Sequence, residues 1–417
     1  LAVILTAFGC AIWCRRHKRP VFTLAVLAFS SFGLLFGQSY GGEAIFRVYL
    51  YALLGCALLI APALVAALDI GNPSSVHEEG RKARALVETA RADVAALVSA
   101  PAETVVFTSG GTEACNLALG LRQAPAGEIK RLMVSAIEHS AVLAAAEESV
   151  LPVELLPVTA DGVVDMAALD AALQDETPAL VCVMLANNET GTIQPIAEIA
   201  AKTRTHGSLL FCDAVQAAGK MPIDIFALGA DALSLSGHKL GAPMGIGALV
   251  THPAVVVPPQ LLGGGQELGR RAGSENISGI AAFAAAAKAA MRDFNDFANL
   301  ADLRDDMEAA LLAVQPQTQI FGKHADRLAN TSCFALGGLN SETLVMALDL
   351  AGVAVSAGSA CSSGKVSRSH VLAAMGAETH ISRGVVRVSL GWQSNREDTE
   401  KLVDEWSKLA GRALAAE

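Results

Sequence analysis

Lys239 and Asp213 each come at the end of a short apolar segment, where a strand would deliver a side chain to a ligand. Lys239 follows the predicted strand 232–235 and precedes a glycine-rich stretch. A charged amine is costly to keep in so apolar a setting, which favours Schiff-base chemistry, although a surface lysine fits the segment equally well. Asp213 could hold a protonated pyridine nitrogen, which would make a bound ring an electron sink, or it could cap a helix.

A glycine turn and a histidine occupy comparable positions. The segment 109–113, Ser-Gly-Gly-Thr-Glu, follows an apolar run and opens a predicted helix, so the backbone N–H groups around Gly111 and Thr112 could bind a phosphate. A plain strand-to-helix turn is the alternative. His139 also lies between a predicted strand and a helix, where its ring could stack on a flat ligand or serve only the structure.

Asn188 and Arg387 complete the set of polar residues at strand ends or within strands. Asn188 follows Asn187 after a predicted strand, and turn formation is the usual role of such a pair. Arg387 lies within an apolar strand, where a guanidinium needs a partner. Either a substrate carboxylate or an internal salt bridge would satisfy it.

Cys361 stands apart from the other cysteines because it lies in a run of small residues, Ser356 to Gly364, that predicts an exposed loop. Lys365, Arg368 and His370 follow closely, and cationic neighbours favour a reactive thiolate. An incidental loop cysteine is the alternative. The remaining cysteines show no zinc-ligand spacing, so we expect no structural metal and mostly reduced, buried thiols, as in a cytoplasmic protein.

The composition argues against a nucleic-acid-binding protein. The 417 residues carry a formal net charge of -10, whereas binding to phosphate backbones needs a basic surface. We therefore expect small substrates or protein partners and no direct nucleic-acid contact.

Residues 1–69 have a different composition from the rest of the chain. The segments 1–14, 21–37 and 44–68 are nearly all apolar, and a basic cluster at 15–19 separates the first two. The segment 44–68 is long enough for a membrane-spanning helix, and the basic loop would lie on the cytoplasmic side. We leave open whether 1–69 attaches the chain to a membrane, forms a cleaved signal or a buried hairpin, or is foreign to the enzyme; since the first residue is Leu, we expect the native start to lie upstream.

From residue 70 onward, short apolar runs alternate with amphipathic stretches, which predicts an α/β fold with a mostly parallel, doubly wound sheet. Strands are predicted at 104–108, 131–135, 179–185, 208–212, 232–235 and 246–250, and helices at 75–98, 113–121, 141–149, 195–205 and 277–292. Beyond Thr331 the pattern is strand, helix, strand, loop, strand, helix. We expect a large domain at 70–292 and a smaller α+β domain at 293–417 that carries the Cys361 loop.

Taken together, these motifs resemble the cysteine desulfurase family, one of the class V aminotransferase-like enzymes of pyridoxal-phosphate fold type I. The resemblance runs from about Gly71 to the C-terminus. It rests on the order of seven motifs along the chain: Asn72-Pro73-Ser74-Ser75-Val76-His77, Thr108-Ser109-Gly110-Gly111-Thr112-Glu113, Glu138-His139-Ser140, Asn187-Asn188-Glu189-Thr190-Gly191, Asp213-Ala214-Val215-Gln216, Ser236-Gly237-His238-Lys239 and Gly358-Ser359-Ala360-Cys361-Ser362-Ser363-Gly364.

The resemblance implies a role for each matching residue. Lys239 would form the Schiff base with pyridoxal 5'-phosphate, Asp213 would hold its pyridine nitrogen and His139 would stack on its ring. Asn188 and Gln216 would contact its phenolic oxygen, and Asn188 would also bind the substrate carboxylate together with Arg387. The phosphate would be bound by Gly111, Thr112, Ser236 and His238. Ser274 would reach the phosphate of a partner subunit. Ser274 stands where the family usually has threonine, and the shared phosphate site implies a homodimer.

The implied activity is conversion of L-cysteine to L-alanine, with a persulfide on Cys361 that passes to a sulfur-acceptor or iron–sulfur scaffold protein, or to tRNA thiolation. Lys239 would act as the general base and Cys361 as the nucleophile. Family members begin with a segment containing Asn-Ala-Thr-Thr-Pro, and here residues 1–69 replace it. A selenocysteine lyase, a class V aminotransferase and an inactive, membrane-tethered relative therefore remain alternatives.

Overall fold

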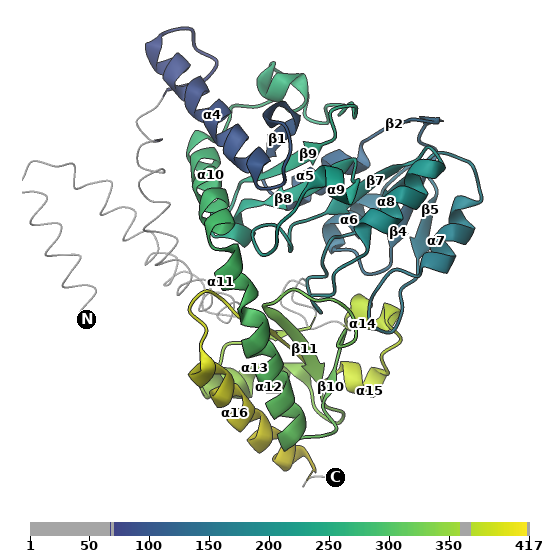
Figure 1. Ribbon diagram of the computed structural model, residues 1–417, viewed down its shortest axis with the longest axis vertical. Helices are drawn as coiled ribbons and strands as arrows, with labels where there is room; N and C mark the ends of the chain where they lie inside the picture. The colour runs from purple at the N-terminus through teal and green to yellow at the C-terminus, as the bar shows by residue number, and fades with distance from the viewer. Residues whose placement is uncertain (1–66, 68–70, 359–367, 415–417) are drawn as a thin grey trace, which may run out of the picture. The chain divides into compact units, whose positions relative to one another are not determined.

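The computed structural model describes Ala67 and residues 71–358 and 368–414 (Figure 1). The predicted apolar helical segment 1–69 lies, apart from Ala67, outside the described residues, and so does Cys361. Within the described ranges, no helix is both long and apolar enough to cross a bilayer.

A seven-stranded sheet forms the centre of the first half of the described chain. Its strand order is β1-β9-β8-β7-β6-β4-β5; β4 to β8 pair in parallel, whereas β9 runs antiparallel to both of its neighbours. The mostly parallel sheet predicted from the sequence is thus confirmed. The strands are β1 (Val105–Thr108), β4 (Arg131–Ser135), β5 (Val153–Leu156), β6 (Ala179–Cys182), β7 (Leu209–Asp213), β8 (Ala232–Ser236) and β9 (Gly247–Thr251).

Helices cover both faces of this sheet, which explains why its strands are apolar at nearly every position. Along β4, Met133 faces one apolar core, and Leu132 and Val134 face the other. The Met133 face packs against α4 (Glu78–Ala96), α7 (Met166–Leu173), α8 (Ile196–Thr205), α9 (Ile225–Leu228) and α10 (Ile277–Arg292). The opposite face packs against α5 (Gly111–Leu119) and α6 (Ser140–Glu147).

A second, four-stranded sheet has the order β10-β11-β13-β12, and all of its pairs are antiparallel. One of its faces packs under a helical layer around Trp406, whose ring lies edge-on to Phe334 with centroids 4.9 Å apart. Figure 1 shows α12 and α16 side by side over this sheet. The elements are β10 (Gln319–Ile320), β11 (Thr331–Ala335), β12 (Ser356–Ala357), β13 (Val385–Ser389), α11 (Phe294–Ala298), α12 (Leu300–Val314), α13 (Ser341–Leu350) and α16 (Arg396–Leu414).

The other face of the small sheet joins it to the large sheet. Val385 and Cys333 pack there with Ile137 and Met184, which follow β4 and β6. Two short helices, α14 (His370–Ala374) and α15 (Thr379–Ser382), border this contact. Because the contact is apolar and buried, it fixes β13 opposite the carboxyl ends of the parallel strands. The predicted domain boundary at residues 292 and 293 stays a prediction.

Most of the predicted elements occur with small shifts at their ends. The strand 131–135 and the helix 277–292 have the predicted bounds, whereas β6 ends at Cys182 rather than at residue 185. Val183 and Leu185 still donate to carbonyls of β7, so the pairing continues beyond the regular strand. The sequence analysis missed β5 and α7. β5 is an edge strand whose first three residues are exposed, so its sequence lacks the apolar pattern of a buried strand.

Four short elements connect the larger ones. They are the two-stranded hairpin β2 (Gln123–Ala124) and β3 (Gly127–Glu128), and the 3-10 turns η1 (Ala102–Thr104), η2 (Gly237–Leu240) and η3 (Gln266–Gly269). Of these, η2 and η3 matter for the site, because they carry or precede residues that the sequence singled out.

Candidate active site

A cavity of about 230 Å³ lies where the loops after the parallel strands face β13. Asn188 comes from the loop after β6, Gln216 from the loop after β7, and Lys239 from η2 after β8, while Arg387 enters from β13. Ligands bind at this edge in open α/β sheets, because loops from neighbouring strands converge there. The fold therefore brings together four residues that are far apart in the sequence.

The lining of this cavity is cationic. It includes Lys220, Lys239 and Arg387 together with the neutral His238, and none of the described lining residues is acidic. An apolar wall of aromatic and aliphatic side chains completes it, with Phe297, Leu390 and Trp392 among them. A small anionic molecule with a flat, apolar body fits this combination.

Lys239 and His238 owe their positions to the tight turn η2. Gly241, with φ 91°, ends the turn in the left-handed region, which a side chain would strain. The His238 Nδ1 atom lies 2.9 Å from the Ser236 hydroxyl. Burial lowers the pKa of His238 to about 4, and the charge of Lys239 acts in the same direction. His238 is therefore neutral near pH 7, and its ring can act as a hydrogen-bonding group there.

Asp213 is buried at the end of β7, and its two carboxylate oxygens differ in their hydrogen bonding. Its Oδ1 accepts hydrogen bonds from the Val215 N–H at 2.9 Å and the Ser234 hydroxyl at 2.8 Å. Within the described chain, Oδ2 has only the Cys115 thiol, at 3.9 Å. The helix cap predicted as one alternative is wrong, because the chain after Asp213 forms a turn and not a helix. One oxygen stabilises this turn, and the second can receive a cationic N–H.

His139 caps α6 through Nδ1, which accepts from the Ala141 N–H at 3.1 Å. Burial lowers the pKa of His139; the charges of Lys239 and His370 also lower it, against the opposing effect of Asp213. The alternative that His139 serves the structure is thus correct for its Nδ1 atom. A neutral ring is also the form that stacks most readily on an aromatic ligand.

The two asparagines after β6 have separate roles. The Asn187 side-chain oxygen accepts from the N–H groups of Glu189 and Thr190, so this residue forms the turn. The Asn188 Oδ1 atom is buried and has no partner in the described chain. Such an atom in a cavity wall indicates a missing donor from a ligand or water.

Arg387 is held by a backbone carbonyl rather than by a carboxylate. Its Nη1 donates to the Asn188 carbonyl at 2.9 Å, and its buried Nε has no partner among the described residues. None of the ion pairs of the described chain involves Arg387. Among the described residues, the internal salt bridge predicted as one alternative for Arg387 is therefore wrong. A ligand carboxylate could accept from the unpartnered Nε.

Gly111 and Thr112 open α5, beside the elements that carry Asp213 and His238. A Cβ atom on Gly111 would come 2.9 Å from Val215 Cγ2 and 3.2 Å from Ser236 Cβ, so only glycine allows this approach. Thr112 is exposed on the first helical turn. The described lining of the cavity does not include these two residues, nor His139, Asp213 and Ser236.

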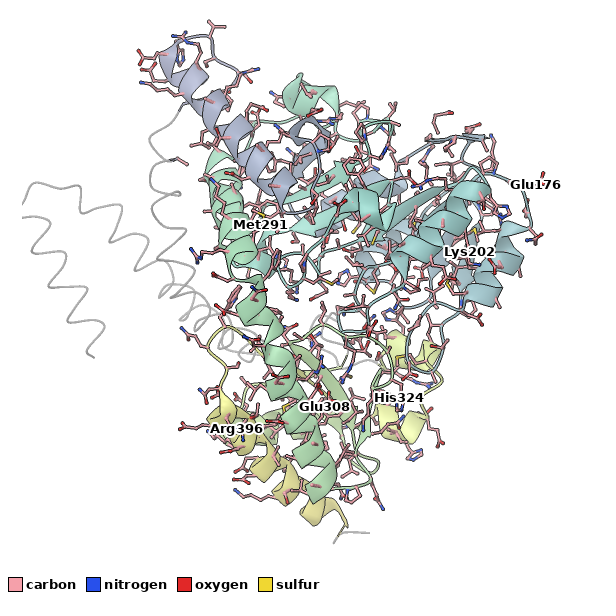
Figure 2. The ribbon with its side chains drawn as sticks, in the orientation of Figure 1. Glu176, Lys202, Met291, Glu308, His324 and Arg396 are labelled. Atoms are coloured by element: carbon pink, nitrogen blue, oxygen red, sulfur yellow. The ribbon has the colours of Figure 1, made fainter. Side chains whose placement is uncertain are left out.

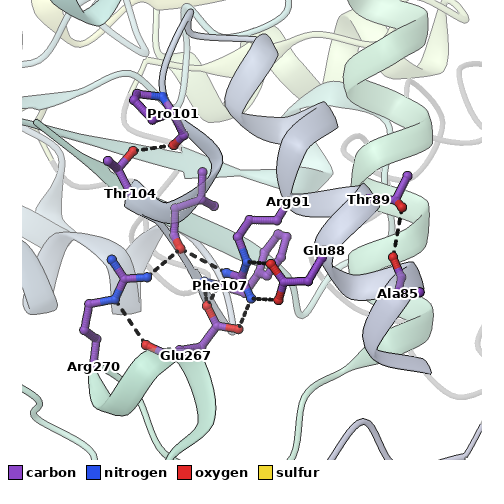
Figure 3. A network of polar contacts seen from close by, with 10 residues as sticks. Ala85, Glu88, Thr89, Arg91, Pro101, Thr104, Phe107, Glu267 and Arg270 are labelled. Atoms are coloured by element: carbon purple, nitrogen blue, oxygen red, sulfur yellow. Dashed lines mark hydrogen bonds and ion pairs between the residues drawn. The ribbon is translucent and has the colours of Figure 1, made fainter. Parts of the chain in front are cut away.

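Ser274 belongs to a loop whose base is anchored to β1. The Glu267 carboxylate accepts from both arms of the Arg91 guanidinium at 2.6 and 3.0 Å and from the Phe107 N–H at 2.9 Å (Figure 3). Farther along the loop, Arg271 pairs with Glu113 in the first turn of α5. These pairs hold the Ser274 loop beside the glycine turn, but Ser274 is not among the described residues that line the cavity.

The described cysteines are all buried, and burial raises their thiol pKa values well above the usual range. Cys182 and Cys212 lie in strands, as predicted, and burial keeps their thiols protonated and unreactive. Their environment is the opposite of the exposed one expected for Cys361.

Comparison with known proteins identifies the family. Residues 67–402 match the model of the aminotransferase class-V family. This chain belongs to that family. It is 39% identical over 348 residues to cysteine desulfurase 2 of Trichormus variabilis, which covers 83% of this chain and 87% of the relative. It is also 39% identical over 341 residues to the cysteine desulfurase IscS of Methanosarcina thermophila, covering 81% and 84%.

Similarity to solved structures agrees with this placement. The NifS-like protein of Rickettsia africae superposes with a TM-score of 0.76 at 29% identity, over 84% of this chain and 95% of that one. DndA of Streptomyces lividans gives 0.67 at 33% identity, over 80% and 95%. The family, fold, enzyme class and pyridoxal-phosphate cofactor predicted from the sequence are thereby confirmed.

The residues present fit pyridoxal phosphate. The available Asp213 Oδ2 can accept from a pyridinium N–H, and the close approach that Gly111 permits suits a phosphorylated ring. The cationic lining matches its negative charge.

Sequence reasoning missed Lys220, which lines the cavity and donates to Gln216 at 2.9 Å. A usable signal was present, because Lys220 follows Gln216 by four residues and comes directly after a glycine. It also missed Glu189, which lies in a quoted motif but received no role. Burial raises the pKa of Glu189 to about 7, despite the Ser369 hydrogen bond and the charge of Arg387.

Proposed function

We propose that this chain is a cysteine desulfurase that converts L-cysteine to L-alanine and carries the sulfur on Cys361. The observation that supports this most is the cavity in which Lys239, Asn188, Gln216 and Arg387 meet. A carboxylate-binding arginine opposite a strand-end lysine suits an amino-acid substrate. The sequence relatives named cysteine desulfurase point to the same substrate.

Each residue has a proposed task in holding the cofactor and the substrate. When bound, pyridoxal phosphate withdraws electrons from the substrate α-carbon. Lys239 would hold the cofactor through its amine, and its Nζ would take the α-proton of the substrate. The phosphate is held by Gly111, Thr112, Ser236 and His238, the ring by His139 and Asp213, and the phenolic oxygen by Asn188 and Gln216; Asn188 and Arg387 orient the substrate carboxylate.

The sulfur step needs a thiolate, which Cys361 supplies. Its sulfur attacks the substrate sulfur, so that an S–S bond forms as the Cβ–S bond of the substrate breaks. The electron pair of the broken bond stays on the β-carbon, which takes up a proton to become the methyl group of alanine. The persulfide on Cys361 then passes to a sulfur-acceptor protein, such as an iron–sulfur scaffold.

Two substitutions test this function on protein loaded with pyridoxal phosphate. Lys239→Ala should retain no covalent cofactor after borohydride reduction and should produce no alanine. Cys361→Ala should keep the colour of the bound cofactor and stop sulfide release from cysteine, and Cys182→Ala is its buried-thiol control. Sulfide release at the normal rate from Cys361→Ala would refute the mechanism.

We further propose that the chain acts as a homodimer with its catalytic part in the cytoplasm, and that Ser274 reaches the phosphate of the partner subunit. The support is the anchored loop that carries Ser274, held by the pairs Arg91–Glu267 and Arg271–Glu113. Ser274→Ala should weaken cofactor retention, whereas a monomer in sedimentation experiments at working concentration would contradict the shared site. Any membrane association through residues 1–69 is a separate proposal, which vesicle flotation of the full chain would test.

A further inference from the structure

Lys220 is the lysine of the cavity that the proposed function does not use. It lies in a turn after β7, where its N–H donates to the Ala217 carbonyl at 3.0 Å. The preceding Gly219 has φ 74°, and a Cβ atom there would come 2.1 Å from Leu240 Cδ2. Glycine is therefore required at 219, and the turn delivers Lys220 to the cavity wall.

The Lys220 side chain makes one directional contact, a 2.9 Å hydrogen bond from Nζ to Gln216 Oε1. An ammonium group has donors only, so the amide of Gln216 must turn its oxygen toward Lys220. The Nε2 group of Gln216, which has no acceptor in the described chain, is then directed away from Lys220. Since Gln216 also lines the cavity, this group is the donor that Gln216 can offer to a ligand.

We propose that Lys220 is a positioning residue that fixes Gln216 as a hydrogen-bond donor to an anionic oxygen of the bound cofactor. This inference rests on the proposed cofactor site and is independent of which amino acid that site accepts. A glutamine without such a neighbour could present either end of its amide to the ligand. In one of the two orientations the amide oxygen would face the anion, which is unfavourable.

The surroundings of Lys220 make this arrangement dependent on pH. Burial lowers the pKa of Lys220 to about 7, and the charges of Lys239 and Arg387 act in the same direction. His238, Lys239 and Arg387 are the other titratable groups of the described lining, and none of its residues is acidic. The donor-only form of Lys220 is thus present below about pH 7, and an anion in the cavity would extend it to higher pH.

The test follows the absorbance of bound pyridoxal phosphate from pH 5 to pH 9 in the holoenzyme without cysteine. Lys220→Met should raise the midpoint of the absorbance change by about one pH unit, because the phenolic anion loses an oriented donor. Lys220→Arg should restore most of the wild-type midpoint. Lys130→Met, at an exposed lysine of the β2–β3 hairpin region, is the control and should leave the midpoint unchanged.

A double-mutant cycle separates positioning from simple charge. In the Gln216→Ala background, Lys220→Met should shift the midpoint no further, whereas an equal shift with and without Gln216 would overturn the proposal. Lys220→Gln replaces Lys220→Met if the latter fails to fold, as judged by thermal melting. Absence of sulfide release from the wild type would refute the proposed function, while this cysteine-free absorbance cycle would still decide the role of Lys220.

Discussion

Partly or fully buried arginines are held in opposite ways in the ion-paired regions of the molecule and at its cavity. At the base of the Ser274 loop, Arg91 is paired with Glu267, and the two side chains are 6% and 2% exposed. Between α12 and β11, Arg327 is paired with Glu308, which Figure 2 labels, at 5% and 6%. At the cavity, Arg387 has a carbonyl partner and a buried Nε without any in the described chain.

The difference separates charged side chains that stabilise the fold from charged side chains that are available to a ligand. Burial acts to lower the pKa of Arg91, but the hydrogen bond and charge of Glu267 outweigh it, so the pKa is raised overall. A paired charge of this kind is satisfied within the chain. Arg387 and Lys220 line a cavity whose described lining has no acidic residue, so a bound anion would supply their countercharge.

The largest expected effect on stability comes from breaking the paired region. Glu267→Gln should lower the free energy of unfolding by about 3 to 5 kcal/mol, because it leaves the Arg91 charge buried without its carboxylate. Urea unfolding followed by circular dichroism measures this. Glu128→Gln, in an exposed pair with Lys130, is the matched control and should leave the free energy of unfolding nearly unchanged. Equal losses in the two variants would remove the contrast.

A smaller effect is expected at Glu189, which borders the cavity. Its folded-state pKa of about 7 lies above the usual carboxyl value of 4.5. The folded protein therefore binds more protons than the unfolded chain, and this group's contribution to stability falls as pH rises from about 4.5 to 7.

Glu189→Gln should remove that loss, so the variant should gain up to about 3 kcal/mol relative to wild type above pH 7 and little below pH 5. The Gln side chain can still accept from the Ser369 hydroxyl, which bonds Glu189 Oε2 at 2.6 Å. Unfolding free energies from pH 4 to pH 9 provide the measurement. A difference that does not vary with pH would contradict the assignment of this titration to Glu189.

The smallest effect on stability is expected at Arg387, where the loss should appear in substrate use. Arg387→Met should leave the free energy of unfolding within about 1 kcal/mol, because no buried carboxylate loses its partner. The value of kcat/KM for cysteine should fall roughly a hundredfold, mainly through KM, since a charged hydrogen-bonded pair with the substrate carboxylate is lost. Arg327→Met should show the reverse pattern, a stability loss with little change in KM.

The sequence predicts the site residues that lie at the ends of strands, because such strand ends can be recognised from short apolar runs. The segments before Lys239, Asp213 and Asn188 are short apolar runs, and their carboxyl ends meet at one edge of a parallel sheet. Arg387 could be singled out as a charge in an apolar strand, but its position opposite that edge depends on the packing of β13 against residues that follow β4 and β6. Such long-range contacts have no local signature.

The chain order of motifs, the alternation of apolar runs with helices and the long helix 277–292 were determined by the amino-acid sequence itself, because they rest on periodicity and local propensity. Tertiary structure alone decided three things: that Asn187 forms the turn while Asn188 faces the cavity, that Arg387 is without a carboxylate partner, and that Lys220 holds Gln216. Each of these depends on distances between side chains that are brought together only when both sheets have packed, and a hydrogen bond or an ion pair is decided by such distances rather than by residue type.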